Sequence, residues 1–212
     1  SHILKVVYMD LSGKKTAGII VAAGLSSRMG DFKPFLELGG RKLIEWTIGS
    51  LRKGGIRDIF VVVGYRADEM INFLGALNVN CVLNESYQST HMLDSLKICL
   101  SRLEGFEQFF LLPCDIPLVN PCSIKALMDY KRNTGSMVVI PAYKGAKGHP
   151  PLIDMKCRDD ILNYTGEGGL KQILKMYSKQ TSILELPDPA VLMDADTPED
   201  FEKLKEYFRS VL

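Results

Sequence analysis

The sequence predicts a three-layer α/β fold in which a mostly parallel central sheet is covered by helices on both faces. Two observations lead to this prediction. Short apolar runs rich in β-branched residues alternate with segments of helical spacing along nearly the whole chain, the order typical of strand–helix–strand units. The chain has 212 residues, of which 46% are hydrophobic, and this is enough apolar material for a core on each side of a sheet.

The predicted strands are short apolar runs bounded by polar or turn-forming residues. The clearest is Asp58 to Val63 (DIFVVV), in which apolar side chains follow one another without alternation, as in a strand buried on both faces. The full set of predicted strands occupies residues 17–23, 58–63, 80–83, 109–112, 136–140, 151–153 and 182–186.

The predicted helices have apolar residues at spacings of three and four. A last helix is expected to start at Thr197, with Pro198 in its first turn and the acidic Glu199 and Asp200 at its positive end. The other helices are predicted over residues 42–53, 67–74, 92–103, 121–132 and 169–177.

The bulk composition excludes several classes of function. The net charge of +1 and the isoelectric point near 7.6 argue against nucleic acid or an anionic membrane as a partner. The five cysteines are odd in number and form no CxxC pair, so neither a disulfide framework nor a structural zinc site is indicated. With no signal peptide or long apolar run, the sequence predicts a cytoplasmic protein.

The chain length favours one domain over two, so we expect a single domain spanning residues 1–212. The sequence begins with Ser1 and His2 rather than with methionine, which is typical of a tag scar or of a fragment of a longer protein. Residues 1–14 are therefore expected to be a tag remnant or a peripheral extension without a functional role.

The strongest functional signal lies at residues 19–33, IIVAAGLSSRMGDFK. An apolar strand ends there in small residues, Ala22 to Gly24, which let backbone N–H groups approach a ligand closely. Arg28 and Lys33 add positive charge for phosphates. The stretch contains neither GxxxxGK[ST] nor a GxGxxG after the strand, so it predicts a polyphosphate-binding loop outside those two classes.

A second signal lies at residues 111–119, LLPCDIPLV, where an apolar strand delivers the carboxylate of Asp115 at its carboxyl end. Ligands of open α/β sheets bind outside these strand ends, and Mg²⁺ bound to a triphosphate needs only one or two protein carboxylates. Asp115 is therefore a candidate metal ligand. The alternative is an aspartate that only caps a turn.

A third signal is a pair of carboxylates in residues 191–204, VLMDADTPEDFEKL. Asp194 and Asp196 alternate on extended chain and therefore point the same way. Asp196 or Thr197 is expected to cap the following helix, whose first turn carries Glu199 and Asp200.

These motifs together resemble a known family. The run AAGLSSRMGDFKPFLELGGRKLIEW is similar to the N-terminal signature of the molybdenum-cofactor nucleotidyltransferases. That family belongs to the nucleotide-sugar pyrophosphorylase-like enzymes, so the resemblance implies a Rossmann-like sandwich of the nucleotide-diphospho-sugar transferase type. The resemblance extends from Ala17 to Phe208.

The resemblance also implies roles for individual residues. Arg28 and Lys33 would contact the triphosphate and stabilise the departing pyrophosphate, and Asp115 would be the metal-binding aspartate, so these three residues are the expected catalytic group. Asp194 and Asp196 would contribute to the metal and phosphate site. We favour Asp194 as the carboxylate that faces the metal, because Asp196 is the more plausible helix cap, but both stay candidates. The implied nucleotide-binding residues are Ala22, Ala23, Gly24, Leu25, Arg28, Lys33, Asn84, Ser95 and Asp115.

Three further segments bear on the resemblance. In NESYQSTHMLDSL, His91 stands where the family has a glycine, a departure that leaves the local turn and the base contacts open. KGHPPLI is similar to the segment beside the acceptor, which implies contacts from Lys147, Gly148 and His149, and residues 144–151 are also the best candidate for a mobile loop. In TGEGGLKQIL, a glycine pair would open a helix whose N-terminus is available to an anion, although an ordinary surface loop is the alternative there.

The predicted reaction moves a nucleoside monophosphate from an NTP to a phosphorylated acceptor, with Mg²⁺ (or Mn²⁺) as cofactor and release of pyrophosphate. The resemblance implies molybdopterin or its metal-bound form as acceptor, and a molybdoenzyme or a fused domain as a further partner. The AAGxSSRMG loop is more similar to the cytidylyltransferases than to the guanylyltransferases, which favours CTP over GTP. Two alternatives stay open: a nucleotidyltransferase for a sugar phosphate or other small phosphate, and a non-catalytic nucleotide-binding regulatory domain of a larger protein.

Overall fold

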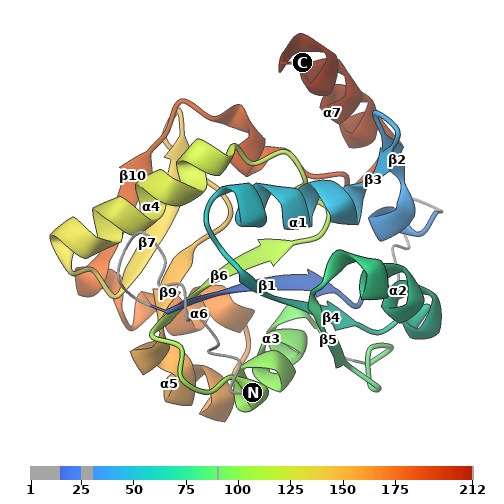
Figure 1. The fold of residues 1–212 in the computed structure, drawn as a ribbon. Coiled ribbons are helices and arrows are strands. Elements are labelled where there is room, and N and C mark those ends of the chain that lie inside the picture. The colour runs from blue at the N-terminus through green and yellow to red at the C-terminus, as the bar shows by residue number, and fades with distance from the viewer. Residues whose placement is uncertain (1–14, 25–30, 90, 212) are drawn as a thin grey trace, which may run out of the picture.

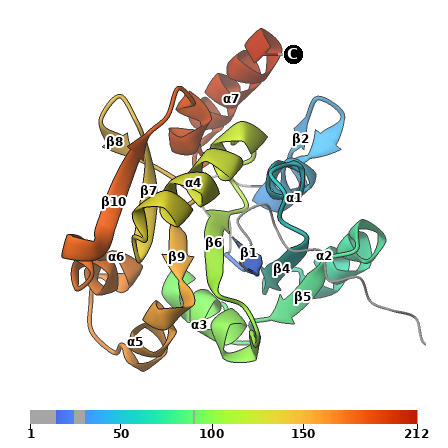
Figure 2. The same ribbon diagram turned by 60° about the vertical axis from the view of Figure 1, so that its left-hand side comes forward.

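The computed structural model describes residues 15–24, 31–89 and 91–211, and in them the predicted three-layer α/β arrangement is confirmed (Figure 1). Within these residues the central sheet has eight strands, in the order β10-β7-β9-β6-β1-β4-β5 with β8 paired to β7, and the order can be followed across Figure 2. The strands of this sheet are β1 (Thr16–Ala22), β4 (Asp58–Val63), β5 (Asn80–Leu83), β6 (Gln108–Pro113), β7 (Val138–Tyr143), β8 (Ala146–Lys147), β9 (Leu152–Asp154) and β10 (Thr181–Glu185).

Neighbouring strands of the sheet run mostly parallel. β1 pairs in parallel with both β4 and β6, β4 pairs in parallel with β5, and β10 pairs in parallel with β7. β9 lies between β6 and β7 and is antiparallel to both. β6 and β7 therefore run in the same direction. The carboxyl ends of β1, β4, β5 and β6 therefore lie along one edge of the sheet, where the polar motifs of the sequence follow.

Helices, short 3-10 turns and a small hairpin connect these strands. The helices are α1 (Leu43–Lys53), α2 (Ala67–Leu74), α3 (Met92–Arg102), α4 (Pro121–Thr134), α5 (Arg158–Asn163), α6 (Gly169–Lys175) and α7 (Pro198–Val211). The 3-10 turns are η1 (Lys33–Phe35), η2 (Gly75–Leu77), η3 (Met155–Cys157), η4 (Ser178–Gln180) and η5 (Pro189–Leu192), and the hairpin consists of β2 (Glu37–Leu38) and β3 (Arg41–Lys42).

The two faces of the sheet carry separate cores. α1, α2 and α4 pack on one face, and α3, α5 and α6 pack on the other (Figure 1). Successive side chains of a strand point to opposite faces, so Ile20 and Leu112 enter the first core while Ile19 and Leu111 enter the second. The unbroken apolar runs in the sequence follow from this burial on both sides.

Some predicted elements differ from the observed ones. The strand predicted at residues 136–140 is β7, which is shifted toward the C-terminus. Residues 144–151 do not form a loop throughout, because they contain β8, which forms a tight antiparallel pair with the end of β7. The β2–β3 hairpin and α5 are not predicted at all, since each is too short to show a periodic pattern.

A third, smaller core joins α7 to the β2–β3 hairpin and to α1. Leu38 and Phe201 are buried in it, and the rings of Trp46 and Phe208 pack edge to face with centroids 5.2 Å apart. The hairpin and α7 approach each other closely at Gly39, where a Cβ would lie 2.2 Å from the Phe208 ring. Gly39 also has a φ of +57°, which favours glycine. The residues just before the hairpin and just before α7 are therefore held near each other.

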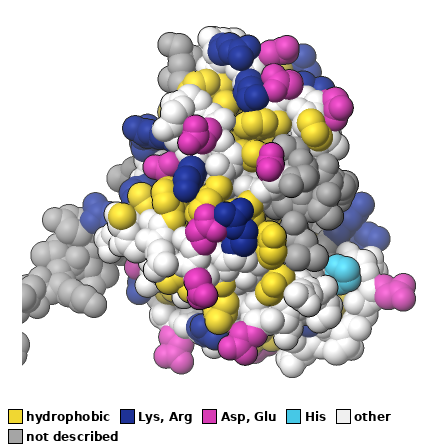
Figure 3. All heavy atoms as spheres, turned by 90° about the vertical axis from the view of Figure 1, so that its right-hand side faces the viewer, with side chains coloured by type: hydrophobic (Ala, Val, Ile, Leu, Met, Phe, Trp, Pro, Cys, Tyr) yellow, Lys and Arg dark blue, Asp and Glu magenta, His cyan; other side chains and the backbone are white. Residues whose placement is uncertain are grey.

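The face on the right-hand side of Figure 1 carries side chains of both charges (Figure 3). Acidic and basic side chains are interspersed with hydrophobic ones, and neither sign gathers into a large area on the described part of this face. This distribution agrees with the net charge of +1. In the described ranges, no helix combines the length and the apolar character that crossing a membrane requires.

Candidate active site

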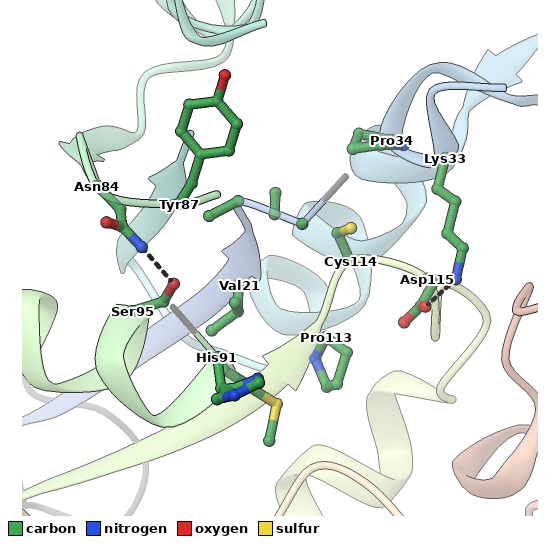
Figure 4. Close-up of a pocket in the computed structure, with 14 residues that line it drawn as sticks. Val21, Lys33, Pro34, Asn84, Tyr87, His91, Ser95, Pro113, Cys114 and Asp115 are labelled. Carbon is green, nitrogen blue, oxygen red and sulfur yellow. Dashed lines mark hydrogen bonds and ion pairs between the residues drawn. The ribbon is translucent and has the colours of Figure 1, made fainter. Parts of the chain in front are cut away.

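A pocket opens at the carboxyl edge of the sheet, beside the ends of β1 and β6. The chain runs from β1 to β4 and β5 on one side of β1 and then returns to β6 on the other side. The loops after β1 and β6 diverge at such a point and leave a crevice, which is the usual ligand position in open α/β sheets. The pocket has a volume of about 200 Å³ and is lined from β1, η1, β6 and the segment between β5 and α3 (Figure 4).

The structure brings most of the predicted nucleotide-binding residues to this pocket. They come from segments far apart in the sequence and meet because parallel strands end at the same edge. Leu25 and Arg28 lie outside the described residues, so their predicted roles stay predictions. The predicted residues in the lining are Ala22, Ala23, Gly24, Lys33, Asn84, Ser95 and Asp115.

The lining also contains residues that no sequence motif indicated, among them Tyr87. A Cβ on Gly64 would lie 2.6 Å from the Cβ of Tyr87 and 3.0 Å from the carbonyl oxygen of Ala23, so glycine after β4 lets Tyr87 pack close to the end of β1. A glycine directly after a buried strand is the signal for this close approach. The other residues missed by the motifs are Val21, Pro34, Met92, Pro113 and Cys114.

Asn84 and Ser95 are joined on one side of the pocket, opposite Lys33 and Asp115 (Figure 4). The side-chain amide of Asn84 donates a hydrogen bond of 3.0 Å to the Ser95 hydroxyl, and its carbonyl oxygen accepts one of 3.1 Å from the backbone N–H of Ser86. Both side chains are buried, so their orientation is set by the protein. His91, the departure from the family pattern, also lines the pocket and precedes α3.

Lys33 is the charged centre of the pocket. Its ammonium group donates to Oδ2 of Asp115 at 3.1 Å and to Oδ1 of Asp196 at 2.6 Å. Burial is the largest single effect on the pKa of Lys33 and lowers it, but the hydrogen bonds and negative charges of the two aspartates together raise it above its ordinary value. Lys33 therefore stays charged and joins two carboxylates from distant parts of the chain.

The two acidic segments are also joined through the backbone. The N–H of Ala195 donates a hydrogen bond of 2.9 Å to the carbonyl oxygen of Asp115, which holds Asp194 and Asp196 beside the Asp115 loop. The pKa of the Asp194 carboxyl is raised, first by burial and then by the negative charges of Asp115 and Asp196. Mutual repulsion among neighbouring carboxylates is typical of functional sites.

The cap of α7 falls on Thr197 and not on Asp196. The Thr197 hydroxyl accepts a hydrogen bond of 3.2 Å from the backbone N–H of Asp200, whereas the carboxylate of Asp196 bonds to Lys33. The preference for Asp194 as the metal-facing carboxylate assumed that Asp196 caps α7, and this assumption was wrong. Asp194 and Asp196 therefore remain equal candidates.

The carboxylates suit a hard cation that arrives with its own oxygen ligands. The described residues contain no group of three or more His, Cys, Asp or Glu arranged to hold a metal by themselves. Mg²⁺ takes one or two protein carboxylates together with substrate phosphates and water, and Asp115 with Asp194 or Asp196 provides that number. The ammonium of Lys33 lies between two of these carboxylates, so a positive charge is accommodated at this position.

The predicted acceptor-binding segment packs against η5, outside the pocket lining. The backbone N–H of His149 donates to the carbonyl oxygen of Val191 at 2.8 Å, and a Cβ on Gly148 would lie 2.3 Å from that oxygen. Lys147 lies on β8 and is exposed. The hydrogen bond from His149 to Val191 joins this segment to η5, which precedes Asp194 in the chain.

The helix N-terminus predicted as an anion site lies elsewhere. The glycine pair at residues 168–169 begins α6 but does not line the pocket. α6 packs instead against α3 and α5 on the second face of the sheet. The structure therefore does not bring this predicted element to the other site residues.

We expect the stability of the folded protein to depend on pH through the buried imidazole of His149. Burial lowers the pKa of its imidazole below the ordinary value of 6.5, and the charge of Asp115 offsets this effect only in part. The unfolded chain then binds the proton more tightly than the folded one, so stability falls as the pH drops from about 6.5 through the native pKa. We expect the melting temperature to fall more between about pH 7 and about pH 5 in the wild type than in His149→Gln; equal falls would contradict this pKa shift.

Known proteins resemble this chain over most of its length. It matches the family model of the MobA-like NTP transferase domain over residues 18–182. The molybdenum cofactor cytidylyltransferase of Escherichia coli (strain K12) is 28% identical over 194 residues, which cover 91% of this chain and 97% of that protein. A probable molybdenum cofactor guanylyltransferase of Natranaerobius thermophilus is 28% identical over 209 residues, which cover 90% of this chain and 95% of that protein.

Solved structures confirm the type of fold. A nucleotidyl transferase from Methanothermobacter thermautotroptrophicus has a TM-score of 0.81 and 23% identity to this chain, and the match covers 93% of this chain and 99% of the other. The predicted nucleotide-diphospho-sugar transferase type of sandwich is therefore confirmed. Because the family model also spans more than half of its length, this chain belongs to the family of MobA-like NTP transferase domains and is a nucleotidyltransferase.

Proposed function

We propose that this nucleotidyltransferase moves a cytidylyl group from CTP to the phosphate of molybdopterin or its metal-bound form, with Mg²⁺ as cofactor. The main support is the meeting of the turn after β1, Lys33 and Asp115 at one pocket. The carboxylate of Asp196 lies outside the pocket lining and accepts a hydrogen bond from Lys33. A triphosphate over the β1 turn meets a cationic side chain and a cluster of carboxylates there, which are the groups that phosphate transfer needs.

The proposed acceptor follows from the relatives. Two relatives that align with nearly the whole chain are named as a cytidylyltransferase and a probable guanylyltransferase of the molybdenum cofactor. The segment of Lys147, Gly148 and His149 is the proposed acceptor side of the site, because the hydrogen bond from His149 to Val191 ties it to η5, which leads into Asp194 and Asp196. The imidazole of His149 is neutral at neutral pH, so it offers the acceptor a hydrogen bond without adding charge.

The proposed preference for CTP rests on the loop after β1. The cytidylyltransferase and the guanylyltransferase relatives are both 28% identical to this chain, so overall identity does not separate the two bases. The Ala-Ala-Gly sequence at residues 22–24 is the feature that favours CTP. Ala23 is 3% exposed and packs in the second core, and its Cβ restricts the backbone beside the pocket more than a glycine would.

The proposed reaction is an in-line displacement at phosphorus. An oxygen of the acceptor phosphate forms a bond to the α-phosphorus of CTP, the bond from that phosphorus to the oxygen bridging the β-phosphate breaks, and pyrophosphate leaves. Asp115 with Asp194 or Asp196 would hold Mg²⁺, which would supply charge neutralisation and orientation of the phosphates. Lys33 exchanges its carboxylate partners for phosphate oxygens and stabilises the leaving group.

Direct competition tests the base and the acceptor. With CTP and GTP at equal concentration, Mg²⁺ and molybdopterin, we expect CTP to be consumed first and one pyrophosphate to be released per transfer. A thermal-shift series of the common NTPs with and without Mg²⁺ gives an independent readout, because a ligand at about 100 times its Kd stabilises a fold by about 2.7 kcal/mol. Preferred use of GTP would reject CTP as the donor nucleotide. Turnover with a sugar phosphate in place of molybdopterin would reject molybdopterin as the acceptor.

A further inference from the structure

Two hydroxyl groups of α1 hold the loop that carries Asp115. The hydroxyl of Thr47 lies 3.0 Å from the carbonyl oxygen of Cys114 and 3.0 Å from that of Leu43, four residues earlier in α1, so its one proton is shared between the two acceptors. The hydroxyl of Ser50 donates to the carbonyl oxygen of Pro117 at 3.1 Å. Cys114 and Pro117 flank Asp115 in the sequence. Thr47 is 0% and Ser50 7% exposed, so water does not compete for either hydrogen bond.

The two hydroxyls lie on the apolar face of α1. Ile44, Ile48 and Leu51 of the same helix enter the core against the sheet, and Thr47 and Ser50 are buried among them at a spacing of three residues. A buried hydroxyl costs free energy unless it finds a partner, and both residues are poorer helix formers than alanine or leucine. Ser50 has its partner in the loop, and Thr47 reaches the loop in addition to the Leu43 carbonyl of its own helix. We therefore expect the benefit of the two hydroxyls to lie in their contacts with the loop.

The loop backbone depends on such outside donors. Prolines on both sides of Asp115 lack an N–H group, which limits the hydrogen bonds that the loop forms within itself. The carbonyl groups of residues 114, 115 and 117 accept from Thr47, Ala195 and Ser50 respectively. The backbone is thus held before, at and after Asp115, while the carboxylate is directed at Lys33 (Figure 4).

We propose that Thr47 and Ser50 are positioning residues for Asp115, which they keep aimed at the metal and the phosphates. The inference rests on the proposed function, in which Asp115 is a metal ligand. Neither hydroxyl belongs to the pocket lining, so both act through the loop backbone. A shift of about 1 Å in a catalytic group can lower turnover by about 10²-fold, so even a partial release of the loop should be measurable.

Thr47→Val is the main test, because valine keeps the volume and branching of threonine but lacks the hydroxyl. We expect its kcat to fall by about tenfold or more, and the gain in CTP affinity that Mg²⁺ provides, measured by calorimetry, to shrink. Thr47→Ser keeps the hydroxyl and should restore both. Thr134→Val is the matched control, since the Thr134 hydroxyl also bonds to the carbonyl four residues earlier, that of Tyr130 at 2.9 Å, but on an exposed part of α4.

A double variant separates positioning from a general structural role. If Thr47 acts through Asp115, adding Thr47→Val to Asp115→Asn has no further effect on Mg²⁺-dependent CTP binding. Additive losses would overturn the inference. Ser50→Ala, with Ser101→Ala as its exposed control on α3, provides the same test if Thr47→Val does not fold.

The outcomes distinguish this inference from the proposed function. Wild-type kcat and wild-type Mg²⁺-dependent binding in both Thr47→Val and Ser50→Ala would overturn the inference and leave the proposed function intact. If CTP competes poorly with GTP in the wild type, GTP replaces it as the probe. Failure of the wild type to bind either nucleotide with Mg²⁺ would overturn the proposed function and this inference with it.

Discussion

Replacement of Asp115 by alanine is expected to lower kcat by about 10²-fold or more. The carboxylate is the proposed metal ligand that both the strand-end position and the pocket geometry indicate, and it lies 3.1 Å from the ammonium of Lys33. Without it, a metal-bound triphosphate loses the protein oxygen that orients it for attack. Pyrophosphate release at saturating CTP and acceptor, followed over a range of Mg²⁺ concentrations, measures the loss.

The fold of Asp115→Ala is expected to remain intact. The Asp115 side chain is 20% exposed, and Lys33 keeps its shorter contact of 2.6 Å with Asp196, so the lysine charge still has a partner. Asp129→Ala is a suitable control, since it removes an exposed carboxylate paired with Arg132 on α4, and it should retain wild-type turnover. Full activity of Asp115→Ala with normal Mg²⁺ dependence would reject Asp115 as the metal ligand.

Replacement of Lys131 by alanine is expected to lower the free energy of unfolding by about 3–5 kcal/mol. Lys131 of α4 donates to a carboxylate oxygen of Asp154, at the end of β9, at 2.9 Å, and the two side chains are only 3% and 12% exposed. Loss of the ammonium leaves the carboxylate charge in the interior, where the hydrogen bond that it accepts from the backbone N–H of Lys156 compensates it only in part. Equilibrium unfolding in urea measures the change.

Two further variants test whether the burial of the Lys131–Asp154 pair causes the loss of stability in Lys131→Ala. The pair Lys131→Met with Asp154→Leu should regain much of the lost stability, because it removes both charges and keeps similar volumes. Lys203→Ala breaks an exposed ion pair with Asp200 on α7, and such a pair is screened by solvent, so little change is expected. A loss in Lys131→Ala no larger than that in Lys203→Ala would contradict a stabilising role for the buried pair.

Local patterns in the sequence were sufficient for the strands and helices nearest the site. The runs that form β1 and β4 are apolar without alternation, which predicts strands buried on both faces. The structure places each of them between two parallel neighbours, β1 between β6 and β4, and β4 between β1 and β5. The small residues after β1 and Asp115 after β6 were predicted site residues because ligands bind at the carboxyl ends of parallel strands. The structure brings these residues together at one pocket.

Other features have no local signature. β9 is short, and its antiparallel insertion between β6 and β7 depends on partners that no periodic pattern specifies. Thr47 and Ser50 resemble ordinary polar interruptions of an apolar helix face, because their acceptors lie 67 positions away in the chain. Asp196 was predicted as the more plausible helix cap because it directly precedes the helix start in the sequence. Its actual partner, Lys33, is 163 positions away and cannot be identified from the local sequence.

The sequence by itself therefore determined the class of fold and the motif residues, because these depend on local periodicity and on residue chemistry at strand ends. The reaction class came from the resemblance of the motifs to a known family. Only the tertiary structure decided which carboxylates meet Lys33 and which hydroxyls hold the Asp115 loop. Those contacts join segments far apart in the chain. Their geometry is set by the packing of α1 against the sheet and of α7 against the β2–β3 hairpin.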